Sequence, residues 1–121
     1  MADAVLDVEQ IRPGTVCVKP RGDLDLGSAY DFDDAVRRLQ EESAPGTVIV
    51  DLREVTFVDS AGLGRLVALA RRGRRLGERV CFVRGPRSVN RLFALTGAGV
   101  LIDWIRTPED APAPPPGLKP A

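Results

Sequence analysis

The sequence contains no histidine, and only two of its 121 residues are cysteines. The missing imidazole argues against a zinc site and against a thiolate–imidazole or Ser–His nucleophile. Cys17 and Cys81 lie in Val- and Phe-rich segments without Cys-x-x-Cys spacing, so we expect both to be small buried hydrophobic residues. The 17 basic and 17 acidic side chains cancel, which gives no reason to expect nucleic acid or an anionic membrane as the main partner.

The sequence also lacks a long apolar run. No segment approaches the roughly 20 apolar residues of a membrane-spanning helix, and the first residues are acidic and unlike a signal peptide. We therefore expect a cytoplasmic protein without membrane contact. The length is that of one domain, and prolines gather near the C-terminus. We predict a single domain over residues 1–106 and a mobile, proline-rich tail over residues 107–121.

Apolar runs and turn residues predict the order strand–strand–helix–strand–helix–strand–helix, followed by a short edge strand. We expect strands at residues 5–9, 15–20, 47–52, 79–84 and 100–102, and helices at about 29–44, 61–76 and 87–96. We interpret residues 21–27 as a loop and residues 53–59 as a polar connector. A first hairpin followed by strand–helix–strand units predicts a small α/β protein with a mixed β-sheet and right-handed crossovers.

Helical spacing predicts which side chains are buried. The first helix has an apolar stripe and a set of charged residues away from it, including Asp33, which we expect in solvent. Ser28 is interpreted as the N-cap of this helix, with Asp31 three positions on. Arginines gather near the end of the second helix, where cations complement the helix dipole. This cluster consists of Arg71, Arg72, Arg74 and Arg75.

Residues 47–64 combine a strand, a connector and a helix start that carries a hydroxyl. The run at residues 47–52 is rich in β-branched residues and does not alternate, which predicts a strand covered on both faces. Ser60 follows at the expected helix start, with Gly62 and Gly64 after it. Ser60 fits two roles: an N-cap that contributes about 1 kcal/mol, or a hydroxyl on which other proteins act. The residues alone leave both roles open, and the two are compatible.

Catalytic interpretations of this stretch are disfavoured. The hydrolase nucleophile elbow needs a glycine two residues before the serine and a histidine base, and both are missing. The only lysines are Lys19 and Lys119, which disfavours a Ser–Lys pair, and no P-loop or complete dinucleotide fingerprint is present. Four carboxylates could in principle hold Mg²⁺, but such groups are more often solvated or cap helices. They are Asp23, Asp25, Asp51 and Asp59. We expect no intrinsic catalysis, no cofactor and no metal.

Three motifs together resemble the STAS domain family, and within it the bacterial anti-sigma-factor antagonists. They are Gly22-Asp23-Leu24-Asp25, the segment Val58-Asp59-Ser60-Ala61-Gly62-Leu63-Gly64 after the strand ending at Asp51-Leu52, and Val-x-x-Leu-Phe-x-Leu-Thr-Gly at residues 89–97. The resemblance covers roughly residues 5–105. It implies a mixed sheet with helices packed largely on one face. It also implies a longer final helix than this proline-rich C-terminus allows.

The resemblance further implies a function. In the family, the serine at the position of Ser60 is phosphorylated by an anti-sigma factor that is also a serine kinase. The unphosphorylated antagonist binds that partner and releases the sigma factor, and a separate serine phosphatase removes the phosphate. The implied phosphorylation site is Ser60, and the implied partner-binding residues are Asp23, Asp25, Asp59, Ser60, Gly62 and Leu63.

A phosphate on Ser60 would add a charge of about −1.5 to −2. Because a helix N-terminus favours an anion, we expect the helix to stay folded and the effect to fall on the interface. Like charges facing each other across an interface cost several kcal/mol. The alternative is a non-catalytic STAS scaffold, or a module that senses a nucleotide or another small molecule.

Overall fold

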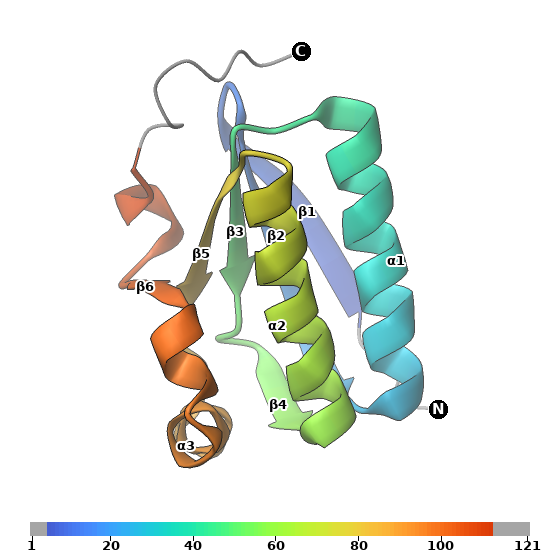
Figure 1. The fold of residues 1–121 in the computed structure, drawn as a ribbon, viewed down its shortest axis with the longest axis vertical. Coiled ribbons are helices and arrows are strands. Elements are labelled where there is room, and N and C mark those ends of the chain that lie inside the picture. The colour runs from blue at the N-terminus through green and yellow to red at the C-terminus, as the bar shows by residue number, and fades with distance from the viewer. Residues whose placement is uncertain (1–4, 113–121) are drawn as a thin grey trace.

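The computed structural model describes residues 5–112. Figure 1 shows how the helices and strands are arranged in space, and they are named here in chain order. They are β1 (Val5–Arg12), β2 (Thr15–Leu24), α1 (Leu26–Ser43), β3 (Thr47–Asp51), β4 (Val55–Val58), α2 (Ser60–Arg75), β5 (Arg79–Val83), α3 (Arg87–Thr96), the 3₁₀ turn η1 (Ala98–Leu101), β6 (Asp103–Ile105) and the 3₁₀ turn η2 (Pro108–Asp110).

Within the described residues the strands form one mixed sheet in the order β1-β2-β3-β5-β6, with β4 paired to β2. The hairpin β1–β2 is antiparallel, and all other pairs are parallel. The predicted fold class is therefore confirmed. The ten-residue strand β2 pairs with β1 along one edge and with two strands along the other edge. On that second edge, residues 15–18 pair with β3 and residues 22–24 pair with β4.

The strand β4 was not predicted. Residues 21–24 and 55–58 were interpreted as parts of a loop and a connector, and both interpretations were wrong. The partner strand β3 ends at Asp51, so the last residues of β2 would have unpaired backbone groups without another neighbour. The β-branched and aromatic run Val55–Val58 supplies that neighbour. Leu24 and Val55 are fully buried where the two strands meet.

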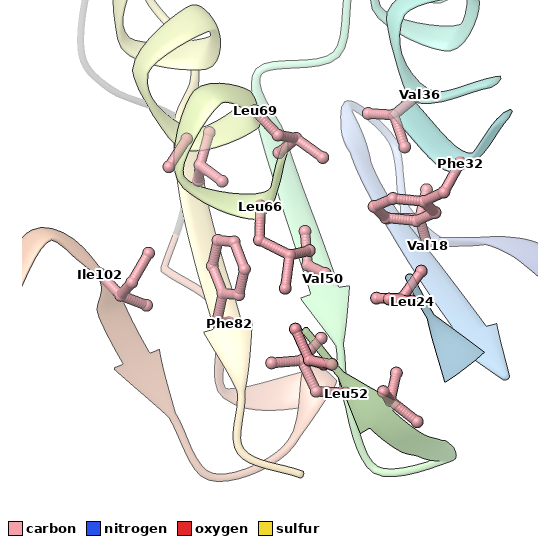
Figure 2. Close-up of a cluster of buried hydrophobic side chains, with 14 of the residues drawn as sticks. Val18, Leu24, Phe32, Val36, Val50, Leu52, Leu66, Leu69, Phe82 and Ile102 are labelled. Atoms are coloured by element: carbon pink, nitrogen blue, oxygen red, sulfur yellow. The ribbon is translucent and has the colours of Figure 1, made fainter. Parts of the chain in front are cut away.

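Helices α1 and α2 lie side by side over one face of the sheet, as predicted (Figure 1). The core lies between them and the strands, and Figure 2 shows side chains from both helices pointing toward the sheet. Phe32 of α1, Leu66 of α2 and Phe82 of β5 are among its buried members. The core also includes Leu69, which completes the buried face of α2.

The opposite face of the sheet carries a smaller cluster of Cys17, Ile49, Val83 and Ala111. Both cysteines are buried and reduced, as expected. Burial is the main cause that raises the pKa of the Cys17 thiol to about 12, and the charge of Asp51 raises it further. Cys17 is therefore a packed thiol at neutral pH.

The end of the chain differs from the prediction in one strand. Residues 98–101 form a 3₁₀ turn, and the edge strand is Asp103–Ile105. Gly97 ends α3 with a φ of 75°. The 3₁₀ turn η1 then occupies residues 98–101, and the backbone becomes extended only at Ile102. Trp104 of β6 makes edge-to-face contacts with Phe82 and Phe93.

The boundary at residue 106 stays a prediction. Thr107 and Asp110 form a capping box around η2, with Pro108 as the first residue, so the start of the predicted tail forms one short turn. Ala111 is buried in the smaller cluster, and Arg12 donates a hydrogen bond to its carbonyl oxygen at 3.3 Å. The predicted mobility of the remaining tail falls on residues 113–121, which lie outside the described residues.

A network of hydrogen-bonded polar side chains connects α1 to α2. It includes Asp33, whose predicted position in solvent was wrong. The Asp33 side chain is buried and not in solvent, with Arg72 donating to its carboxylate at 2.9 Å. Arg72 also donates to Gln40, which donates to buried Glu78 at 2.7 Å. Burial raises the pKa of Glu78, although the hydrogen bond from Gln40 opposes the shift. One arginine of the cluster predicted near the end of the second helix therefore bridges two helices.

Candidate functional site

The start of α2 is capped by Asp59, and the interpretation of Ser60 as the N-cap is wrong. Asp59 has extended backbone angles, and its Oδ1 accepts a hydrogen bond from the Gly62 N–H at 2.8 Å. The carboxylate thus satisfies one of the N–H groups that have no partner within the helix. Because Asp59 takes the capping position, Ser60 becomes the first helical residue.

Ser60 is exposed, and its hydroxyl makes no hydrogen bond with any residue of the described range 5–112. The serine is held between two regular elements, since β4 ends directly before the cap Asp59 and Ser60 is the first residue of α2. The helix dipole and the free N–H groups of the first turn favour an anion beside this hydroxyl. A phosphate at this position would therefore stabilise the helix start.

Gly62 brings α2 against the end of β2. A Cβ on Gly62 would lie 2.0 Å from the carbonyl oxygen of Leu24 and 3.2 Å from Val58. The Asp59 N–H donates to the same Leu24 carbonyl at 3.3 Å. Only a glycine permits this approach, and the contact places the start of α2 next to the residue between Asp23 and Asp25.

The two predicted acidic residues of the β2–α1 connection have separate local roles. Asp23 is the last but one residue of β2, and its Oδ1 accepts a hydrogen bond from the Thr56 hydroxyl of β4 at 2.8 Å. Asp25 is the N-cap of α1. The hydrogen bond from the Ser28 N–H is the largest cause that lowers the pKa of Asp25, so this carboxylate is ionised at neutral pH.

The placement of Asp25 corrects the role of Ser28. Ser28 was interpreted as the N-cap of α1, but it is the third residue of the helix and forms a capping box with Asp25. Its buried hydroxyl accepts from the Asp25 N–H at 3.1 Å and donates to the carbonyl oxygen of Asp23 at 2.6 Å. Ser28 therefore ties the start of α1 to the end of β2.

The remaining predicted partner-binding residues are mostly inside the protein. Gly62 is buried, and the Leu63 side chain is only 6% exposed. Their packing explains why the sequence has these residues at the start of α2. Direct partner contact by Gly62 and Leu63 stays a prediction. Because both residues are buried, a partner could touch only the small part of them that is accessible at the start of α2.

The fourth carboxylate considered for Mg²⁺ is committed to ion pairs. Asp51 is fully buried, and Arg53 donates to its Oδ2 at 2.8 Å while Lys19 lies 3.9 Å away. Burial acts to raise the pKa of Asp51, but the hydrogen bonds from Arg53 outweigh it and the pKa is lowered. Within residues 5–112, no group of three or more Asp, Glu, Cys or His side chains is arranged to hold a metal ion.

Sequence reasoning missed several exposed apolar side chains on the elements around Ser60. Phe57 of β4 is 51% exposed, and Leu26 and Tyr30 of the first turns of α1 are exposed to similar extents. These elements meet at the end of the molecule where α1 and α2 begin (Figure 1). The run Val-Thr-Phe-Val is typical of a strand, so an assigned β4 would have placed Phe57 on a strand three residues before Ser60.

Comparison with solved structures places this arrangement among known folds. An anti-sigma factor antagonist from Mycobacterium paratuberculosis aligns with a TM-score of 0.73 over 89% of this chain and 90% of that chain, at 26% identity. The anti-sigma factor antagonist SpoIIAA in its unphosphorylated form aligns with a TM-score of 0.72 over 87% and 91% of the two chains, at 20% identity. Bacillus SpoIIAA in its phosphorylated form gives 0.67 over 87% and 95%, at 19% identity.

The family assignment rests on a larger part of the chain than any single motif. None of the helices in the described part is both long and apolar enough to cross a membrane. The family model of the STAS domain matches residues 8–111, from β1 to the residue after η2. The protein therefore belongs to the STAS domain family.

Proposed function

We propose that this protein is an anti-sigma-factor antagonist controlled by phosphorylation of Ser60. In this proposal the unphosphorylated form binds an anti-sigma factor with serine-kinase activity in the cytoplasm and releases the sigma factor. Phosphorylation by that partner weakens the complex, and a serine phosphatase restores binding. The protein acts by binding and carries no catalytic activity, cofactor or metal of its own.

The observation that carries the proposal is the exposed hydroxyl of Ser60 as the first residue of α2. Asp59 performs the capping, so the hydroxyl is free for a kinase. Supporting evidence comes from the 26% identical anti-sigma factor antagonist of Mycobacterium paratuberculosis. SpoIIAA, which shares the fold, is known in phosphorylated and unphosphorylated forms.

The charges around Ser60 give the switch its direction. Asp59 adjoins the serine, and the Leu24 contact brings the connection that holds Asp23 and Asp25 to the same helix start. A phosphate adds about two negative charges to this acidic surface. Like-charge contacts across an interface cost several kcal/mol, and about 3 kcal/mol is roughly a hundredfold in affinity. No change of fold is needed.

The first experiment locates the phosphate. The protein is incubated with ATP and candidate anti-sigma kinases, and the sites are mapped by mass spectrometry. We expect one phosphate on wild type, confined to Ser60, and none on Ser60→Ala. Ser88 is a matched control because it is an exposed serine in the first turn of α3. Modification of Ser88 at a similar rate would contradict a specific site.

The second experiment measures the affinity for the kinase that modifies Ser60. Ser60→Ala should bind like wild type, and Ser60→Asp should bind at least about tenfold more weakly, because one added charge is a partial substitute for phosphate. Ser88→Asp carries the same charge change and should bind like wild type. Equal affinities for all four proteins would refute the switch.

The same assays separate the alternative function. A scaffold or a sensor of small molecules would show no phosphate on Ser60 with any cognate kinase. A sensor would in addition bind a nucleotide or another small molecule saturably, which calorimetry measures directly.

A further inference from the structure

A groove of about 600 Å³ runs along the outer side of α2. One wall comes from α2 itself, where residues from Ser60 to Arg75 line the groove. The other wall comes from the corner between α3 and η1, and includes Gly97, Ala98 and Leu101. The Arg74 side chain donates to the Leu101 carbonyl at 2.8 Å and so holds this corner against α2. Ser60 therefore stands at one end of a built surface feature.

The charge of the groove has one sign. Its charged lining residues are Arg65, Arg71 and Arg75. Arg65 is partly engaged, since its guanidinium lies 3.6 Å from Asp33 and 5.1 Å from the Tyr30 ring centre. Arg71 and Arg75 are exposed, and neither makes an ion pair or a side-chain hydrogen bond with any residue between 5 and 112. They are two cations available to a partner.

The bottom of the groove is apolar between these arginines. Leu63 and Val67, which are four residues apart and share one side of the helix, line it together with the adjacent Ala68. Gly64 adds no side chain, and a Cβ built there would meet nothing within 4 Å. A ligand must therefore combine an apolar face with negative charge.

The length of the groove favours a polypeptide. Arg65 and Arg75 are ten residues apart on one helix, which is about 15 Å along its axis. A single phosphate or small metabolite does not span that distance. We propose that the groove is the docking site for an acidic, amphipathic segment of the anti-sigma factor. This inference rests on the proposed function and names the partner's chemistry.

The position of Ser60 links this docking to the switch. An acidic segment seated along Arg71 and Arg75 passes the start of α2, where the phosphate is added. The phosphate then faces like charge on the partner at one end of the groove, while the arginines at the other end are unchanged. Release is therefore caused by added repulsion at the acidic end of the groove, where Asp59 adjoins Ser60, while the attraction to Arg71 and Arg75 is unchanged.

Charge reversal tests the inference. Binding of the kinase that phosphorylates Ser60 is measured by calorimetry for wild type, for Arg71→Glu with Arg75→Glu, and for the control pair Arg38→Glu with Arg87→Glu. The control makes the same charge change at exposed arginines of α1 and α3, outside the groove. We expect the groove pair to weaken binding at least about tenfold and to reduce its salt dependence, with the control close to wild type.

A steric series at Gly64 provides a second measurement. Gly64→Ala leaves most of the groove open, whereas Gly64→Leu fills the groove next to Ser60 without touching the core. We expect binding to fall only with leucine, while thermal unfolding shows that both variants are folded. A photo-crosslinker in place of Ala68 should capture a partner peptide rich in Asp and Glu.

The outcomes separate the two proposals. If wild type binds no anti-sigma kinase, the proposed function fails and this inference fails with it. If wild type binds and Ser60→Asp weakens binding, but the groove pair and Gly64→Leu bind like wild type, only the groove is excluded. A crosslinked peptide that is basic, or that lacks acidic residues, also overturns the inference.

Discussion

The starts of α1 and α2 contain similar residues, but the serine is buried and hydrogen-bonded in one and exposed in the other. Each helix has an aspartate as its N-cap and a serine within the first turn. In α1 the serine is the third residue, and Ser28 is buried in a capping box. In α2 the serine is the first residue, and Ser60 is exposed, with no hydrogen bond to its hydroxyl in the described part of the chain.

The difference comes from position within the turn. A side chain at the third helical residue reaches back to the cap, whereas one at the first residue points away from it. The third residue of α2 is Gly62, which is packed against Leu24 of β2. Ser28 bonds to Asp23 of the same strand. Both helices therefore pack against the end of β2. Helix α1 does so through the Ser28 hydroxyl, and α2 through the close approach that Gly62 permits. Only in α2 does the serine hydroxyl have no hydrogen bond within the described residues.

The largest expected effect comes from filling the contact of α2 with β2. Gly62→Ala places a methyl group 2.0 Å from the Leu24 carbonyl oxygen, so the helix start must move. We expect a loss of about 3 kcal/mol in the free energy of unfolding, at the upper end of overpacking effects. Denaturant titration measures it. Gly27→Ala in α1 is the control, because a Cβ there meets nothing within 4 Å, and a similar loss in both would contradict the close contact.

The two serines should differ in stability. Ser28→Ala removes a buried hydroxyl and leaves the Asp25 N–H and the Asp23 carbonyl without their partner. We expect a cost of about 2 kcal/mol. Ser60→Ala should change stability by less than about 0.5 kcal/mol, because its hydroxyl has no partner to lose. Paired urea titrations check both values, and a cost for Ser60→Ala equal to that of Ser28→Ala would mean that Ser60 is structural.

A smaller change, which stabilises the protein, is expected at Gly64, two residues after the contact of Gly62 with Leu24. Gly64→Ala adds a methyl group in open space within α2, and alanine is favoured over glycine in a helix by about 0.5–1 kcal/mol. We expect the melting temperature to rise by a few degrees. A fall would show that α2 needs the flexibility of this glycine.

The smallest effect concerns the charge of the α1 cap. The folded state lowers the pKa of Asp25, mainly through the hydrogen bond from the Ser28 N–H. The stabilisation by the ionised cap is therefore present above the ordinary aspartate pKa of about 3.9 and is lost as the pH falls through the folded-state pKa. Asparagine also caps helices well, so Asp25→Asn should lie slightly below wild type at neutral pH and approach it in acid.

Urea titrations of wild type and Asp25→Asn at several pH values measure this convergence. Asp31→Asn is the control, since Asp31 is exposed on the same helix and makes no side-chain hydrogen bond with residues 5–112. A gap between wild type and Asp25→Asn that stays constant down to about pH 2 would contradict the shifted cap.

Local patterns were enough for several features of this protein. Apolar spacing placed the three helices, and a β-branched run predicted the buried strand at residues 47–52, which the structure has at Thr47–Asp51. Both patterns depend only on neighbours along the chain. The absence of histidine disfavoured a Ser–His or thiolate–imidazole nucleophile, and the Asp-Ser-x-Gly-Leu segment pointed to Ser60. These inferences needed residue types and short spacings alone.

The tertiary structure decided the features that depend on distant residues. The strand β4 exists because the end of β2, about thirty residues earlier, needs a partner. Asp33 is buried because Arg72 reaches it from another helix. Likewise, Asp59 and not Ser60 is the cap, because the contact of Gly62 with Leu24 sets where α2 begins. The sequence named the serine, and the packing of α2 against β2 made its hydroxyl free.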